Sequence, residues 1–287
     1  MSISTKAMVL NLQVGVWSGQ RLDKEATRKV TEDNNAESDA ARVNKHLIPK
    51  PAFKDITATG TAVRAHFYDN TLPWKDNGDR LLTRNMYREF IERHEALAKD
   101  FDNAVDRFLM RDYPSAVEQA GFRMGDLFDI TDYPSPAGLR HKFYINLDID
   151  AVTESGDFRV QMDKDELDGV RATMEKAMEQ RIAGAMLSVW ERLAKVVTHF
   201  AEKMGDEDKI FRNSTVTNLE ALVELLPGLN VLDDPDLEKI RLDIKRTLCG
   251  YSPDDLRKDS AVRTAAADEA KAIMETMQGF MTAFGNK

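Results

Sequence analysis

Cysteine is nearly absent from this sequence, since Cys249 is the only one in 287 residues. A single cysteine cannot form an internal disulfide, and it cannot supply a zinc site built from several cysteines. The glycines are few and scattered, and the sequence contains neither a Gly-x-x-x-x-Gly-Lys-Ser/Thr phosphate loop nor a Gly-x-Gly-x-x-Gly fingerprint. Nucleotide sites that depend on either glycine-rich loop are therefore excluded.

Long apolar runs are also missing. No stretch approaches the ~20 apolar residues that a transmembrane helix needs, and the first residues lack the basic and apolar regions of a signal peptide. Hydrophobic residues nevertheless make up 42% of the chain and charged residues 31%, which is enough apolar material for a folded core. These features predict a folded, cytoplasmic protein without a membrane segment.

Acidic residues outnumber basic ones, and the net charge is -9. The excess is uneven: residues 1–80 contain 12 Lys and Arg against 10 Asp and Glu, a net charge of +2, so residues 81–287 carry -11. An acidic body repels nucleic acid at long range. Any nucleic-acid contact is therefore expected from a local basic face in the N-terminal part.

Most of the chain has helical periodicity. Apolar residues recur at three- and four-residue steps over residues 83–112 and 163–204, as in amphipathic helices. Two helices of this length are expected to pack antiparallel. Shorter helices are predicted over residues 20–30, 37–47, 51–67, 219–226, 235–248 and 259–284.

Strand patterns occur at three places. Apolar and polar residues alternate over residues 8–16, and again over 143–150 and 158–162 on either side of Gly156. The last two segments predict a hairpin over residues 143–162, which the first strand would join in an antiparallel sheet. The predicted class is mainly α (α+β), with a long antiparallel helix pair, a small antiparallel β-sheet and a helical C-terminal region. The expected regions are residues 1–80, 81–212 and 213–287, which can also form one domain.

No catalytic or metal-binding motif is present. The histidines lie singly, without the spacing of a metal site: His46, His66, His94, His141 and His199. Cys249 lies near the end of an amphipathic helix and is interpreted as a small packing residue rather than a nucleophile. The sequence therefore predicts no catalytic residues, no metal and no cofactor. An enzyme built from scattered carboxylates is a disfavoured alternative, because the sequence alone does not identify a pair.

Two surfaces are candidates for binding. The first is a basic strip on the N-terminal helices, which could contact phosphates and consists of Arg21, Lys24, Arg28, Arg42 and Lys45. Interleaved acidic residues favour an ordinary solvated face there. The second is the loop over residues 68–80, where Tyr68, Trp74 and Arg80 could anchor a partner or stack on bases. Trp74 could equally fix this loop onto the core, and the pattern does not separate the two interpretations.

Several short motifs together resemble a known family. They include Tyr68-x-x-Thr-Leu-Pro-Trp74, Tyr133-Pro-Ser135 and the segments at residues 17–24, 39–45 and 156–160. This series is similar to an uncharacterised family of phages and conjugative elements that carries a domain-of-unknown-function label. The resemblance implies genes that lie near a MoxR-type AAA ATPase and near recombination genes, and it supplies no established active site.

Together these features predict a non-enzymatic interaction protein of a phage or mobile element, either an adaptor or a self-assembling subunit. A protein partner or self-association is expected, and the resemblance makes a MoxR-type AAA ATPase the first candidate partner. The alternative is a DNA-binding protein of recombination or DNA metabolism, which would use the basic strip.

Overall fold

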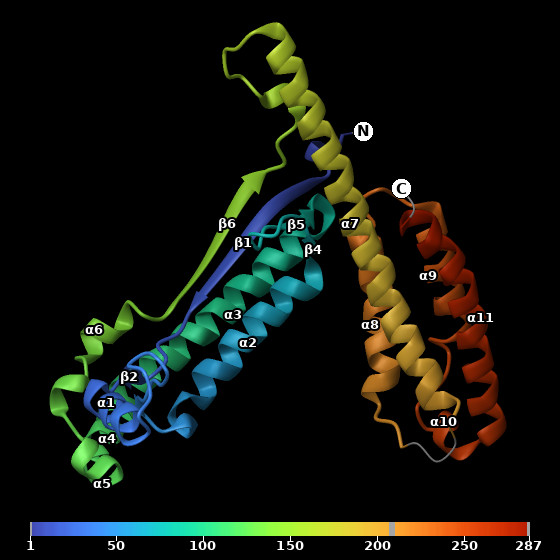
Figure 1. Ribbon diagram of the computed structural model, residues 1–287. Coiled ribbons are helices and arrows are strands. Elements are labelled where there is room, and N and C mark those ends of the chain that lie inside the picture. The colour runs from blue at the N-terminus through green and yellow to red at the C-terminus, as the bar shows by residue number, and fades with distance from the viewer. Residues whose placement is uncertain (1, 207–209, 286–287) are drawn as a thin grey trace. The chain divides into compact units, whose positions relative to one another are not determined.

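The computed structural model describes residues 2–206 and 210–285, with side chains described up to Met281. The chain divides into two compact units (Figure 1). Unit 1 comprises Met1–Asn11, Tyr68–Phe90 and Asp148–Lys287, and unit 2 comprises Leu12–Phe67 and Ile91–Leu147. Both units are discontinuous in sequence.

The expected fold class is confirmed. The protein is 66% helical, with a small antiparallel sheet of 4 strands and a helical C-terminal region. Within the described residues, no helix combines the length and the apolar character needed to cross a bilayer.

The helices of unit 1 form around one long helix, α7 (Lys164–Met204). The other helices are α8 (Ser214–Leu229), α9 (Pro235–Thr247), α10 (Asp255–Lys258) and α11 (Ser260–Gly285). α7 packs against α8 and α11, and α11 runs antiparallel to it (Figure 1). Ala266, Ala267 and Ala270 of α11 are buried in this core, and small side chains allow two helices to approach closely.

The long antiparallel pair is therefore α7 with α11, and the more specific prediction that residues 83–112 would be the partner of α7 is wrong. Residues 87–112 form α3 (Tyr87–Arg107) and a π-helical turn (Phe108–Asp112), preceded by a 3-10 turn (Arg84–Met86). Their apolar stripe is buried instead in the core of unit 2, where Phe101 and Val105 lie. Periodicity identified the buried face of each helix, but it carries no information about which element covers that face.

The sheet has the strand order β4-β5-β1-β6. Its strands are β1 (Ala7–Gly15), β4 (Leu72–Pro73), β5 (Arg80–Thr83) and β6 (Tyr144–Ala151). β1 pairs antiparallel with β5, with Met8 opposite Leu82. The first strand of the expected hairpin is present as β6, but residues 158–162 form no strand. Val160 and Met162 are exposed, so this segment has no buried face to hold it in a sheet.

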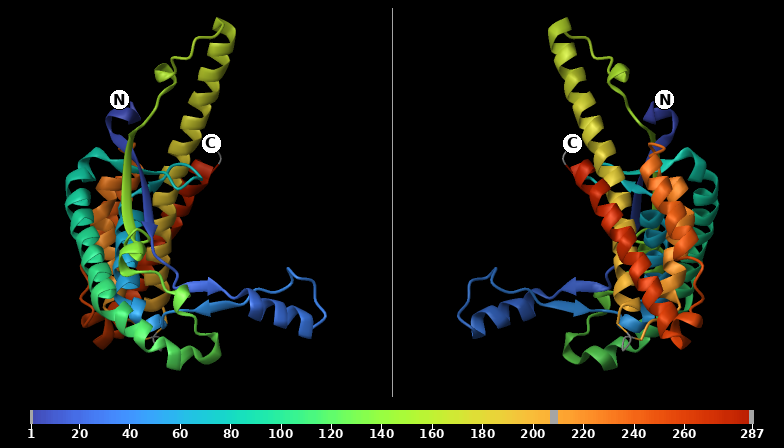
Figure 2. Two further views of the ribbon diagram at one scale, coloured as in Figure 1. Left: turned by 90° about the vertical axis from the view of Figure 1, so that its left-hand side faces the viewer. Right: turned by 90° about the vertical axis from the view of Figure 1, so that its right-hand side faces the viewer.

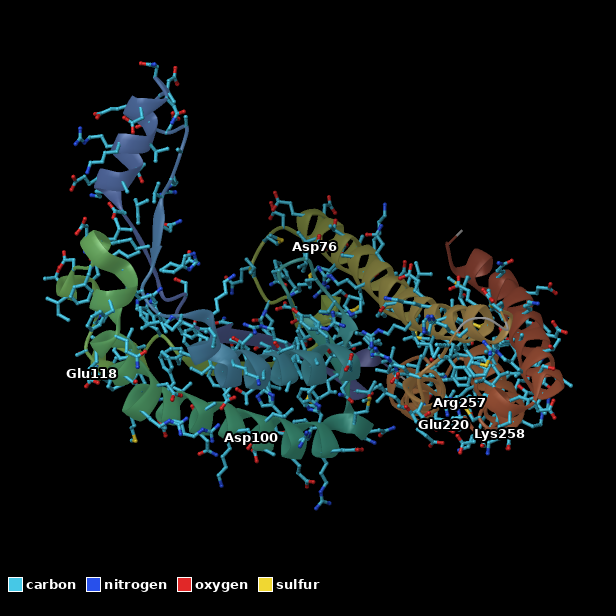
Figure 3. All side chains as sticks on the ribbon, turned by 90° about the horizontal axis from the view of Figure 1, so that it is seen from below. Asp76, Asp100, Glu118, Glu220, Arg257 and Lys258 are labelled. Atoms are coloured by element: carbon cyan, nitrogen blue, oxygen red, sulfur yellow. The ribbon has the colours of Figure 1, made fainter. Side chains whose placement is uncertain are left out.

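Unit 2 contains α2 up to Phe67 (α2 spans Lys54–Asn70), most of α3, and three short helices. The short helices are α4 (Tyr113–Glu118), α5 (Ala120–Met124) and α6 (Pro136–Arg140). The core includes the aromatic side chains of Phe101, Phe108 and Phe143. Acidic side chains lie outside it, for example Asp100 on α3 and Glu118 on α4 (Figure 3).

A two-stranded ribbon of unit 2 carries α1 at its end (Figure 2). β2 (Gln20–Leu22) pairs antiparallel with β3 (Asn44–His46), and α1 spans Lys24–Asp33. The helix expected over residues 20–30 therefore begins later, after its N-cap Asp23. The helix expected over residues 37–47 is wrong, because its last residues pair with β2 instead.

Candidate partner-binding site

The loop at residues 68–80 separates into a buried part and an exposed part. Trp74 is only 5% exposed and lies in the hydrophobic core of unit 1. We therefore assign Trp74 to the core, which corrects its placement in the predicted partner surface. Tyr68 is 52% exposed, and Arg80 is half-buried at the start of β5. The turn between β4 and β5 is exposed, with Asp76 at its surface (Figure 3).

Arg80 is held by backbone and hydroxyl oxygens at the end of α2. Its Nε donates to Thr71 Oγ1 at 2.7 Å, and its Nη2 donates to the carbonyl oxygen of Thr71 at 2.7 Å. Nη2 also lies 3.5 Å from the carbonyl oxygen of Tyr68. The guanidinium lies over the Tyr68 ring, 4.9 Å from its centroid, in a cation–π arrangement.

A second guanidinium, that of Arg192 in α7, reaches the same carbonyl group. Its Nη2 donates to the Thr71 carbonyl oxygen at 2.7 Å, and its Nη1 donates to the Asp69 carbonyl oxygen at 3.1 Å. These carbonyl groups lie at or just beyond the C-terminal end of α2, the negative end of the helix dipole. Arg80 and Arg192 therefore cap this end of α2 together.

The two guanidiniums also affect each other. Burial and the charge of Arg192 lower the pKa of Arg80 to about 10. Burial lowers the pKa of Arg192 as well, and the Asp69 carboxylate partly opposes that shift. Arg80 is nonetheless protonated at pH 7, since its pKa stays well above neutrality.

Carbonyl oxygens satisfy hydrogen-bond donors, but they do not neutralise charge. Across the part of the chain that the structure describes, no carboxylate forms an ion pair with Arg80, Arg192 or Lys195. The result is a concentration of positive charge within an acidic protein.

These cations line one side of an open cleft of about 610 Å³. Its lining consists of Tyr68, Asp69, Arg80, Arg192, Lys195, Val196, Asn218, Ala221, Leu222 and Leu225. The α8 side supplies mainly aliphatic side chains, and the α7 side supplies two of the cations. A cleft with a cationic side and an aliphatic side suits a ligand that has an anionic group beside an apolar one.

The predicted basic strip is largely neutralised within unit 2. Arg21 Nε lies 3.0 Å from Asp132 Oδ1, and Lys45 forms an ion pair with the same carboxylate. Arg28 forms an i,i+4 pair with Glu32 at 2.9 Å. The hydrogen bond to Asp132 raises the pKa of Lys45 against the opposing effect of burial.

Only two members of the strip keep an uncompensated charge. Lys24 and Arg42 are exposed, and neither forms an ion pair with any residue that the structure describes. The strip thus offers fewer available cations than its sequence suggests.

His94 and Cys249 lie in packed environments, whereas His46, His141 and His199 are exposed. His94 is 6% exposed, and burial together with His66 lowers its pKa. Burial, together with Glu220 on α8 (Figure 3) and Glu224, raises the pKa of the Cys249 thiol to about 11. Among the described residues, no group of three or more His, Cys, Asp and Glu side chains is placed to hold a metal ion.

Sequence analysis identified Tyr68 and Arg80 but missed Arg192, Lys195 and Asn218. Arg192 lies between the buried residues Trp190 and Leu193, so its position beside an apolar stripe was the one available signal. Nothing in the sequence connects it with a loop more than 100 residues earlier. No protein-family model, curated protein or solved structure matches this chain, so the function of the cleft is argued from its geometry.

Proposed function

We propose that this protein is a non-enzymatic interaction protein that binds an anionic segment of a partner protein in the Arg80–Arg192 cleft. The observation that carries this proposal is the pair of guanidiniums that share a carbonyl oxygen and form no ion pair with a carboxylate of the described residues. Two like charges that share one acceptor repel each other, so an anion bound between them gains from both.

The composition of the cleft supports a protein ligand. Arginine and tyrosine are among the residue types that most often dominate interface energetics, and both are present here as Arg80, Arg192 and the exposed Tyr68. The aliphatic side of the cleft, which includes Leu222 and Leu225, adds apolar surface that a partner can cover.

The family resemblance extends this proposal to a biological setting. The resemblance implies a phage or mobile-element protein, and we propose that it acts there as an adaptor or self-assembling subunit. A MoxR-type AAA ATPase encoded nearby is the first partner to test. This setting follows from the resemblance alone, whereas the cleft would serve any partner of suitable chemistry.

Site-specific photocrosslinking tests the proposal. Replacing Tyr68 with p-benzoyl-phenylalanine puts a photoreactive group at the cleft, and the same replacement at Tyr87, an exposed residue outside the cleft lining, is the matched control. We expect one partner protein to crosslink from position 68 in cells, to be identified by mass spectrometry, and to bind again when purified. Adding Arg192→Gln should remove this crosslink. An identical crosslink in the Arg192→Gln variant would refute the proposal.

A further inference from the structure

We infer that the group recognised between Arg80 and Arg192 is a carboxylate that lies next to an aliphatic side chain in a protein segment. This inference rests on the proposed function and specifies the chemistry of the partner. The carboxylate can come from an Asp or Glu side chain or from a C-terminus, because both present the same two oxygens.

Within the described residues, two guanidinium nitrogens have no protein acceptor once the cap of α2 is made. The hydrogen bonds to the end of α2 use Nε and Nη2 of Arg80 and both Nη atoms of Arg192. Arg80 Nη1 and Arg192 Nε have no acceptor within residues 2–206 and 210–285, and neither nitrogen is buried. Two oxygens of one ligand group can therefore accept from two prepositioned cations.

The charge of the protein and the lining of the cleft both restrict the size and charge of the ligand. The protein has a net charge of -9, which repels a polyanion such as a nucleic acid more strongly than a single carboxylate. The cleft also has an aliphatic side formed by Val196, Ala221, Leu222 and Leu225. Phosphate or a phosphodiester chain would leave this surface uncovered, whereas a leucine beside the carboxylate would cover it.

The two guanidiniums are held in place before a ligand binds. Each guanidinium is anchored by at least two hydrogen bonds, and Arg80 also lies over the Tyr68 ring. A ligand therefore meets donors whose side-chain entropy is already lost, which favours binding.

The competing explanation is that both arginines only cap α2. In that case their free donors would contact water, and small carboxylates would bind no better than their neutral analogues. The two explanations differ in ligand selectivity, which stability measurements alone do not report.

The test titrates the full-length protein with four organic probes and with inorganic phosphate, and follows binding by NMR of the arginine Nε–H groups. N-acetyl-leucine carries a terminal carboxylate beside its side chain, and N-acetyl-leucyl-aspartyl amide carries a side-chain carboxylate. N-acetyl-leucinamide lacks the charge, and acetate lacks the aliphatic group. We expect at least one of the two carboxylate probes to bind about tenfold more tightly than both N-acetyl-leucinamide and acetate, with shifts at Arg80 and Arg192. The tighter of the two identifies the source of the carboxylate.

Two variants test whether the probes bind in the cleft. Arg192→Gln should weaken the preferred probe about tenfold, and Arg212→Gln, an exposed arginine of unit 1 outside the cleft lining, should not. If Arg192→Gln fails to fold, Lys195→Glu serves in its place, because Lys195 is exposed and its change leaves the cap of α2 intact. Two outcomes would overturn the inference. One is equal binding of the carboxylate probes and N-acetyl-leucinamide, and the other is tighter binding of inorganic phosphate than of either carboxylate probe.

The proposed function fails separately from this inference. If phosphate is preferred while the Tyr68 photocrosslink still depends on Arg192, the protein is an interaction protein with a different ligand chemistry. If carboxylates bind selectively while the photocrosslink does not depend on Arg192, the anion site stands and the partner surface lies elsewhere.

Discussion

Two pairs of basic side chains each converge on one acceptor group. One pair is Arg21 and Lys45 in unit 2, and the other is Arg80 and Arg192 in unit 1. The first pair shares the carboxylate of Asp132, whose side chain is only 5% exposed. The second pair shares the carbonyl oxygen of Thr71. A carboxylate removes charge as well as satisfying donors, whereas a carbonyl group does only the latter.

This difference shows why a count of basic residues does not locate an anion-binding surface. The basic strip of unit 2 has five cations in the sequence, of which Arg21, Arg28 and Lys45 are ion-paired. In the cleft of unit 1 the sequence indicated only the cation Arg80, but the fold adds Arg192. No carboxylate of the described residues forms an ion pair with either arginine, and Asp69 in the cleft lining opposes their charge only partly. The balance of charge after folding decides which group can bind an anion.

The largest effect is expected from Trp74, which is buried in the core of unit 1. Trp74→Ala should lower the free energy of unfolding by ~3–5 kcal/mol, because it truncates a large buried side chain. Tyr68→Ala, in the same loop but 52% exposed, should cost about 1 kcal/mol or less. Denaturant unfolding measures both. A small loss of unfolding free energy for Trp74→Ala would show that this side chain is not part of the core, and Trp74 would then again be a candidate for the partner surface.

The second-largest effect is expected when the carboxylate shared by Arg21 and Lys45 is replaced by a neutral acceptor, as in the Arg80–Arg192 pair. Asp132→Asn removes the shared charge from Arg21 and Lys45, and should destabilise the protein by about 3 kcal/mol because a nearly buried ion pair loses one member. The matched control Glu32→Gln breaks the exposed pair with Arg28 and should cost no more than about 0.5 kcal/mol. Similar unfolding midpoints for the two variants would show that Asp132 is not a significant structural anchor.

The third effect is expected when a carboxylate is added beside Arg80 and Arg192 in unit 1. Asn218→Asp adds a carboxylate of nearly the same shape to the cleft lining and should weaken N-acetyl-leucine binding about tenfold. Thr217→Asp changes the net charge equally on the exposed surface of α8, outside the cleft lining, and should leave binding within about twofold. NMR titration measures both constants. Equal losses in the two variants would mean that long-range charge, rather than the cleft, controls binding.

The elements predicted best from sequence were those with long periodic patterns. The helix expected over residues 163–204 is α7, Lys164–Met204, because its apolar stripe is sustained over many turns and its N-cap Asp163 marks the start. The short elements were predicted poorly. β5 has only four residues, and the strands β2 and β3 have three each, so their conformation is set by pairing rather than by local pattern.

The site was predictable only where its residues are close in sequence. Tyr68 and Arg80 flank a loop with clear turn signals, whereas Arg192 and Asn218 reach the cleft through the packing of α7 against its neighbours. Trp74 shows a second limit, since an aromatic residue in a loop fits both a core and an interface. Burial decided between these interpretations, and the sequence contains no measure of burial at a single isolated position.

The smallest effect concerns nucleic acid and the unit 2 strip. If Asp132 holds Arg21 and Lys45, only Lys24 and Arg42 remain to contact phosphates. Binding to a single-stranded oligonucleotide should then be weak, and log K should fall with log salt with a slope of only about -1.4, since each phosphate contact contributes about -0.7. Replacing both Arg21 and Lys45 by Gln should leave this slope unchanged. A fluorescence-anisotropy series from low to high salt measures it. A slope near -3 that becomes less steep in the double variant would show that the ion pairs with Asp132 open on binding. Both groups of basic residues would then be anion sites, and a DNA-binding function would be favoured.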